Sequence, residues 1–168
     1  MNKVNADGTF GNTVFDSDNW RKGWTHVEFF QSPGKDTFLL LFNKSDKIIR
    51  TYRVGDDGTP QVPAIADGSL PRTYEIVQIL KLNGRDHLFL HDTTLAISVV
   101  RSLTDIGTIG GVEYEEEWTP GYDTFAFYRN SGPNTFLMRD NKQNGIPGTL
   151  DPVVHVPVPV PVLGHCSI

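Results

Sequence analysis

Residues 23–30 read GWTHVEFF, and the same pattern of an aromatic residue followed by a strand-like stretch returns as TYEIVQIL at 73–80 and GYDTFAFY at 121–128. The copies begin at intervals of 50 and 48 residues. A period of this length marks one supersecondary unit per copy, and such a unit cannot bury its apolar face alone. The sequence therefore predicts three similar units that cover one another.

Each copy is predicted to contain only β-strands. The first strand alternates, so that Val27 and Phe29 lie on one face. A turn follows, and then a strand that is apolar at every position from 38 to 42, which must be buried on both faces. A third strand at 47–54 and a weaker fourth strand around Val62 complete the copy. We expect about four strands per copy and an all-β chain.

The third copy stops after residue 145, and its missing part stands at the start of the chain. Residues 5–9 repeat the Asp-Gly-Thr turn of residues 56–59, and residues 153–156 can supply a third strand. A ring in which the two terminal segments meet would leave no sheet edge unpaired. We therefore expect one domain over 1–152, with repeats at 20–69, at 70–117, and at 118–152 together with 1–19.

The last residues, 153–168, alternate valine and proline over much of their length. Proline removes a backbone donor and favours an extended chain, so such a segment can pair through one edge only. We expect an extended strap over the closing repeat or a tail.

Two architectures agree with this pattern. The size and number of the repeats resemble the β-trefoil family, a closed barrel with pseudo-threefold symmetry, and a β-trefoil is the fold that we expect. The alternative is a set of β-propeller blades completed by oligomerisation, because blades bury both faces of their strands. Residues 18–20 (DNW), 23–24 (GW) and 29–30 (FF) resemble one blade of the tachylectin-2 lectin family.

Composition excludes several classes of protein. The net charge is −5 and no run of Lys or Arg exceeds two residues, so a nucleic-acid groove is not expected. The single cysteine, Cys166, cannot form an intrachain disulfide. The chain shows no apolar stretch of about 18 residues and no signal peptide, which predicts no membrane insertion. We expect a cytoplasmic protein, or one secreted without a visible leader.

The densest cluster of titratable residues lies at the two ends of one predicted strand, with Asp86 and His87 near its start and His91 and Asp92 near its end. Residues four apart on a strand are about 13 Å apart and cannot chelate one ion. The cluster therefore predicts polar residues at the ends of a buried strand, and no metal site. Without a nucleophile elbow, phosphate loop or dinucleotide fingerprint, we expect neither an enzyme nor a cofactor.

Aromatic and polar residues recur once per repeat, and these are the residue types that bind sugars by ring stacking and hydrogen bonds. They also suit core rings and turn formers. We predict a carbohydrate-binding lectin that binds glycans or glycoproteins at up to three sites, with a homodimer as a further expectation; the alternative is a protein-binding module such as a protease inhibitor. The candidate site residues are Trp24, Asp36, Asn43, Tyr74, Asp86, His87, Asp92, Tyr122, Asn134 and Asp140.

Overall fold

The structure is a computed structural model that describes residues 2–7, 9–13, 22–129, 135–140 and 154–155. Every regular element within these ranges is a β-strand, which confirms the all-β prediction. The first two repeats each form one four-stranded antiparallel sheet whose strands follow one another in chain order. Unit 1 contains β3 (His26–Gln31), β4 (Thr37–Asn43), β5 (Ile48–Val54) and β6 (Ala66–Ser69). Unit 2 contains β7 (Ile76–Leu82), β8 (Arg85–Asp92), β9 (Ile97–Leu103) and β10 (Ile109–Glu117).

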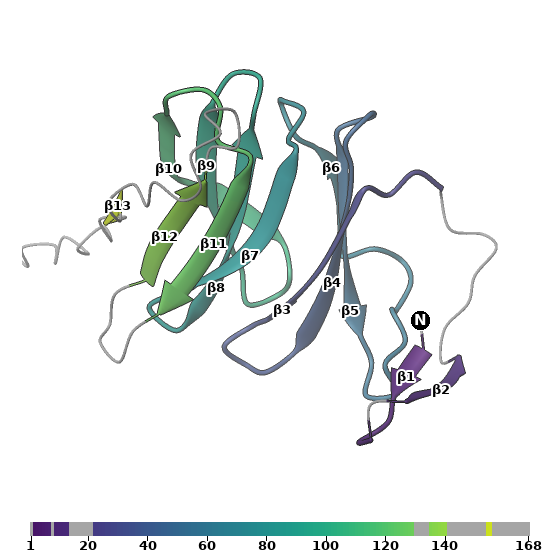
Figure 1. Ribbon diagram of the computed structural model, residues 1–168. Coiled ribbons are helices and arrows are strands. Elements are labelled where there is room, and N and C mark those ends of the chain that lie inside the picture. Colours follow the sequence, from purple (N-terminus) through teal and green to yellow (C-terminus); the bar gives the residue numbers. More distant parts are fainter. Residues whose placement is uncertain (1, 8, 14–21, 130–134, 141–153, 156–168) are drawn as a thin grey trace, which may run out of the picture.

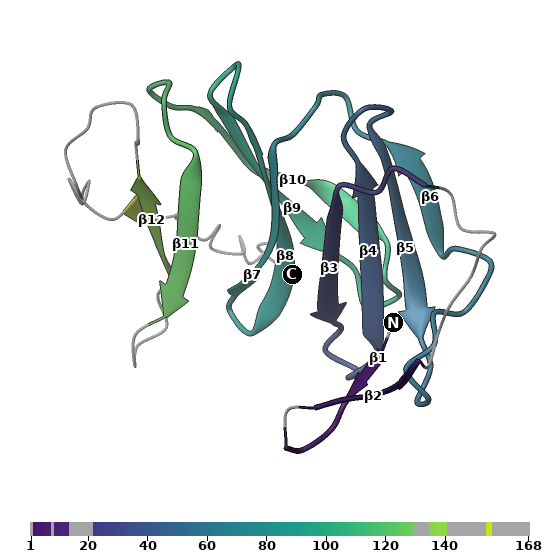
Figure 2. The ribbon, with the colours of Figure 1, turned by 45° about the vertical axis from the view of Figure 1, so that its right-hand side comes forward.

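Unit 3 is the third repeat and consists of β11 (Thr124–Arg129), β12 (Thr135–Asp140) and β13 (Val154–His155). β13 pairs with β12 in antiparallel fashion, which confirms the third strand expected near residue 154. The three units stack in chain order, with unit 2 in the middle (Figures 1 and 2). Within the ranges that the structure describes, the sheets stay open and none closes into the barrel of a β-trefoil.

The N-terminal hairpin repeats the corner between the third and fourth strands of a unit. Its strands are β1 (Asn2–Val4) and β2 (Phe10–Thr13). At its turn the Asp7 carboxylate accepts a hydrogen bond of 3.0 Å from the Thr9 amide, just as Asp57 accepts one of 2.9 Å from Thr59. The predicted similarity of these two turns is therefore confirmed.

The same hairpin differs from expectation in its place. β1 and β2 form a sheet of their own, at the end of the stack opposite to unit 3 (Figures 1 and 2). The expected meeting of the terminal segments within one chain is thus not seen among the described strands. Val62 also differs, because it lies in the loop before β6 and not in the fourth strand. The sheet pairing of β5 with its successor begins only at Ala66, after the proline-containing segment 60–63.

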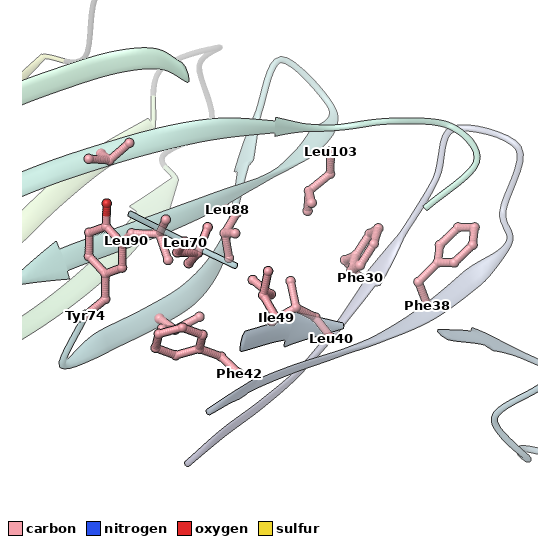
Figure 3. Packing of buried hydrophobic residues seen from close by; sticks show 12 residues of the cluster. Phe30, Phe38, Leu40, Phe42, Ile49, Leu70, Tyr74, Leu88, Leu90 and Leu103 are labelled. Carbon is pink, nitrogen blue, oxygen red and sulfur yellow. The ribbon is translucent and has the colours of Figure 1, made fainter. Parts of the chain in front are cut away.

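The main core lies between units 1 and 2 (Figure 3). Alternate residues of β4, Phe38, Leu40 and Phe42, point toward unit 2 and meet Leu88 and Leu90 of β8. Burial of each such side chain contributes roughly 1.5–3 kcal/mol. The intervening residues of β4 are buried on the opposite face, as the continuous apolar run predicted.

A second core joins units 2 and 3. Phe89 of β8 packs against Trp118 at 6.2 Å, Phe125 at 5.4 Å and Phe127 at 4.9 Å between ring centroids. Both faces of β8 are therefore covered, one by each neighbouring unit. This sharing of the middle sheet makes the three units one stack.

His91 lies within this second core, 4.6 Å from the ring of Phe125, and shares a hydrogen bond of 2.8 Å with Ser98. Burial lowers the pKa of His91 below its ordinary value of 6.5, although the carboxylates of Asp92 and Glu75 partly oppose this effect. The imidazole is thus neutral in the folded protein at pH 7. The equivalent pair in unit 1 is Phe42 and Ile49.

This burial predicts a pH-dependent stability. As the pH falls below 6.5, the unfolded chain binds a proton at His91 before the folded protein does. The free energy of unfolding should therefore decrease as the pH decreases, by up to about 1.4 kcal/mol per pH unit. The double variant His91→Phe/Ser98→Ile copies unit 1 and removes the titrating group. Urea titrations between about pH 7 and pH 5 should therefore show a shallower pH slope for the double variant than for the wild type. Equal slopes would contradict the assignment to His91.

Candidate functional site

An open cleft of about 450 Å³ lies at the junction of units 1 and 2. Three segments form it: the turn from β4 to β5, the connection from β6 to β7, and the turn from β8 to β9. Its volume falls within the range of small-ligand sites. Its lining residues are Lys47, Pro71, Arg72, Thr73, Glu75, Asp92, Thr94 and Leu95.

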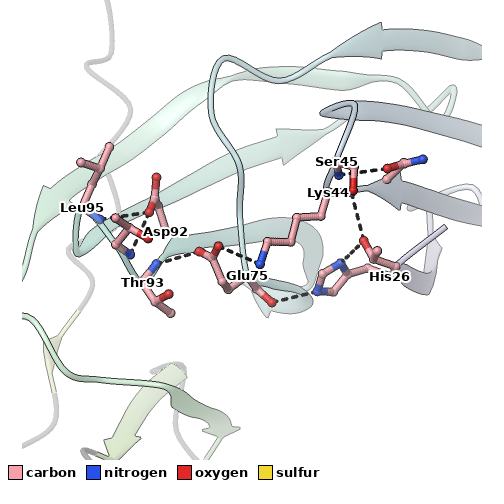
Figure 4. A network of polar contacts seen from close by, with 10 residues as sticks. His26, Lys44, Ser45, Glu75, Asp92, Thr93 and Leu95 are labelled. Atoms are coloured by element: carbon pink, nitrogen blue, oxygen red, sulfur yellow. Dashed lines mark hydrogen bonds and ion pairs between the residues drawn. The ribbon is translucent and has the colours of Figure 1, made fainter. Parts of the chain in front are cut away.

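Glu75 holds the three sides of the cleft together (Figure 4). One carboxylate oxygen lies 3.0 Å from the Lys44 ammonium of unit 1, and the other accepts a 2.9 Å hydrogen bond from the Thr93 amide of unit 2. The backbone carbonyl of Glu75 also accepts a 2.9 Å hydrogen bond from Nε2 of His26 in unit 1. The side chain and the backbone of one residue thus connect both units.

The environment of Glu75 favours its charged form. Burial by itself raises the pKa of Glu75, but the hydrogen bond from the Thr93 amide and the charge of Lys44 outweigh it and leave the pKa below its ordinary value of 4.5. Glu75 is therefore a carboxylate at neutral pH. A fixed carboxylate beside an open cleft is a strong acceptor for ligand hydroxyl groups.

The turns beside the cleft are shaped by two of the predicted residues. Oδ1 of Asp92 accepts hydrogen bonds of 3.0 Å from the amides of both Thr94 and Leu95. Asn43 forms the equivalent turn in unit 1, with its Oδ1 accepting from Ser45 at 3.0 Å. Such side-chain turns are the usual reason for Asp and Asn after a strand. In unit 2 the turn leaves Leu95 exposed at the cleft.

The charges around the cleft balance. Lys47 and Arg72 bring two cations, and Glu75 and Asp92 bring two carboxylates. Arg72 lies 2.9 Å from Glu115, and this ion pair fixes its direction. Pro71 and Leu95 add apolar surface to the same rim. The cleft therefore combines donors, acceptors and apolar contacts without a strong preference for charge.

The three predicted aromatic residues lie outside the lining of the cleft. Tyr74 is buried in the core between units 1 and 2. Trp24 is half-buried on the outer face of unit 1, with the Arg50 guanidinium 5.8 Å from its ring. Tyr122 packs in the second core, and the guanidinium of Arg139 lies 4.4 Å from its ring. All three rings pack against protein side chains.

The predicted polar residues at the start of the second strand have separate places. Asp36 forms an ion pair with Arg53. Asp86 is buried and accepts a 2.8 Å hydrogen bond from the Gln31 amide of unit 1, while its other oxygen lies 3.1 Å from Lys81. The strand register makes Asp86 equivalent to Thr37 and not to Asp36, because the turn of unit 1 is one residue longer.

The remaining predicted residues are also dispersed. Nε2 of His87 lies 3.0 Å from Glu113, at the end of β8 away from the cleft. Asp140 faces Thr124 in the register and is therefore equivalent to Phe42 and not to Asn43. Asn134 lies outside the described residues. Of the nine candidates that the structure describes, Asp92 alone lines the cleft.

Sequence reasoning missed Glu75 and Arg72. Glu75 directly follows the aromatic residue of its repeat, where the other copies have Thr25 and Asp123. Thr25 makes one of the contacts that Glu75 makes, since the Thr25 hydroxyl accepts a 3.1 Å hydrogen bond from the amide of Lys44 in the turn of its own unit. A polar residue after each aromatic was thus the available signal.

No protein-family model matches the chain, and neither does any curated protein. Among the described residues, no helix has the length and apolar character needed to cross a bilayer. Within the same part of the chain, no group of three or more His, Cys, Asp or Glu side chains is arranged to hold a metal ion.

The burial of Tyr74 predicts a structural role that can be measured. Tyr74→Ala should lower the free energy of unfolding by about 3–5 kcal/mol, because it leaves a cavity between units 1 and 2. Tyr74→Phe keeps the ring and serves as the control, with a loss below that of the alanine variant. Chemical denaturation of both variants gives the comparison. A loss under about 1 kcal/mol for Tyr74→Ala would show that the ring does not belong to the core.

Proposed function

We propose that the protein is a carbohydrate-binding lectin without catalytic activity, and that its ligand lies in the cleft beside Glu75. The observation that carries this proposal is the cleft itself, in which a fixed carboxylate, two cations and two apolar residues share one open surface. A neutral sugar offers hydroxyl groups on its edges and C–H groups on its faces. The balanced charge of the lining suits such a ligand better than a nucleotide or a lipid phosphate.

We further propose that the three units are blades of a β-propeller. Support comes from the order of the strands, which follow the chain within each four-stranded sheet, and from the face-to-face stacking of successive sheets. Of the two architectures expected from the sequence, this arrangement favours the propeller over the β-trefoil. A ligand site between neighbouring blades agrees with this arrangement, because the junction of units 1 and 2 brings turns of both sheets together.

The polar groups of the cleft include both hydrogen-bond acceptors and hydrogen-bond donors. Glu75 and Asp92 can accept hydrogen bonds from ligand hydroxyl groups, whereas Arg72 and Lys47 can donate to ring and hydroxyl oxygens. Leu95 and Pro71 offer an apolar contact to the C–H face of a sugar. Open sites of this kind bind single sugars weakly, and several sites on one particle raise the overall avidity through effective concentration.

A glycan array followed by calorimetric titration of the strongest ligand tests this function. Leu95→Arg places a large charged side chain in the cleft and should weaken binding by at least tenfold, or about 1.4 kcal/mol. Glu75→Gln removes the carboxylate charge and should weaken binding in the same direction. Ile106→Arg is the matched control, since it adds the same charge to the turn at the other end of β9, and it should bind like the wild type.

Two results would count against the proposal: a wild-type protein that binds no glycan, or a Leu95→Arg variant that binds as the wild type does. A protein that fails on the array but inhibits members of a protease panel would instead favour the protein-binding module. Thermal melts of each variant separate loss of binding from loss of folding.

A further inference from the structure

Units 2 and 3 each bury one particular face against the unit that precedes them. It is the face that carries the aromatic residue of the repeat and the alternating residues of the first strand. In unit 2 these residues are Tyr74 and Val77, both within the core shared with unit 1. In unit 3 they are Tyr122, Phe125 and Phe127, within the core shared with unit 2. This face is therefore an interface wherever a preceding unit exists.

Unit 1 carries the same face at the end of the stack. We name it the Trp24 face and define it by Trp24, Val27, Phe29, Leu39 and Leu41. The register makes Val27 equivalent to Val77, and Phe29 to Ile79. Val27 is 56% exposed and Phe29 is 48% exposed, whereas Val77 is 2% exposed. Unit 1 thus exposes two large apolar residues at the positions where unit 2 packs against the sheet that precedes it.

Part of the Trp24 face is covered by unit 1 itself. Leu39 and Leu41 are buried beneath Trp24 and Ala64. The exposed part is strand β3, the first strand of unit 1. The first strand of unit 2, β7, contacts the first strand of the unit before it, which is β3. By the same arrangement, a unit that preceded unit 1 would lie against the exposed strip of β3.

The other end of the stack offers the complementary face. Met138 of unit 3 is 41% exposed. Its equivalents are Leu40 in unit 1 and Phe89 in unit 2, and both are buried against the unit that follows. Unit 3 thus ends the stack with the side that receives a following unit, and unit 1 begins it with the side that receives a preceding one.

The N-terminal hairpin points to another copy of this chain as the preceding unit. β1 and β2 reproduce the corner between a third and a fourth strand, with Val4 opposite Phe10 as Val54 is opposite Pro60. The described part of unit 3 has three strands and does not include that corner. In one chain the hairpin and unit 3 lie at opposite ends (Figures 1 and 2). A head-to-tail neighbour would bring them together.

From these features we infer that a second copy of the chain packs unit 3 against the Trp24 face, so that two copies close a head-to-tail ring. Such a contact joins two different surfaces, and it ends in a ring only when the rotation closes. Two chains of three units form a six-bladed ring, within the common range of four to eight blades. This assembly does not depend on what the cleft between units 1 and 2 binds.

Light scattering coupled to gel filtration tests the assembly on the full chain. The wild type should have about twice the chain mass of 18.7 kDa. Val27→Glu places a charge in the interface and should give a monomer, and Met138→Glu should do the same from the other face. Ile106→Glu changes an apolar side chain that is 69% exposed in a turn away from both faces, and it should leave the dimer intact.

Mixing the two monomeric variants tests the head-to-tail geometry. The Val27→Glu chain keeps its unit 3, and the Met138→Glu chain keeps its Trp24 face, so one intact contact remains and a mixed dimer should appear. A contact between identical faces would not be restored in this way. Circular dichroism confirms that each variant is folded, and if one is not, the other still reports on the contact.

A monomeric wild type would overturn the inference, and would mean that other segments of the same chain cover the Trp24 face. A folded Val27→Glu variant that stays dimeric would overturn it as well. Failure to obtain the mixed dimer would exclude the head-to-tail arrangement. Glycan binding measured on the same monomeric variants keeps this result separate from the test of function.

Discussion

Strands β4 and β8 bury side chains on both of their faces, and the other elements of the fold are arranged to cover them. Five consecutive residues of β4, from Phe38 to Phe42, are each at most 2% exposed. In unit 1 the side chains of Trp24, Val54 and Ala64 lie against one face of β4 and unit 2 covers the other, whereas β8 depends on a neighbouring unit for each of its faces. For unit 2 both neighbours are present in the chain, and the two cores on its faces follow from that requirement.

Polar contacts fix how the units sit on one another, because apolar packing alone has little directional preference. The buried hydroxyl of Thr51 donates a 2.7 Å hydrogen bond to the carbonyl of Gly107. Gly107 has a φ of 84°, and a Cβ there would lie 2.4 Å from the ring of Phe38, so the corner of unit 2 can approach unit 1 only with glycine at this position. The carboxylate of Asp86 and the ring of His26 add one hydrogen bond each across the same junction. The cleft beside Glu75 lies where this junction reaches solvent.

Much of the fold could be predicted from the repeat, because strand alternation and two-sided burial are local properties of the sequence. The pairing between units could not, since a β-trefoil and a stack of blades use similar strands and differ in contacts between residues far apart in the chain. Position 86 shows a smaller limit of prediction from the sequence. A turn that differs by one residue moves Asp86 out of the place of Asp36, and periodicity alone does not reveal this shift. Tyr74 shows another, since a recurring aromatic residue suits a sugar site and a core equally well.

The repeats define where a junction lies, but individual side chains decide what each junction can do. The residue after the aromatic is Thr25 in unit 1 and Glu75 in unit 2. Thr25 has one side-chain oxygen, and it accepts a hydrogen bond from the turn of its own unit. Glu75 has two oxygens: one makes the equivalent contact to Thr93, and the other reaches Lys44 in the preceding unit. Threonine at this position could hold the turn but could not bridge the two sheets. The carboxylate that bridges units 1 and 2 beside the cleft, and with it the ligand site that we propose there, therefore arises from the divergence of the copies, whereas their symmetry accounts for the stacking.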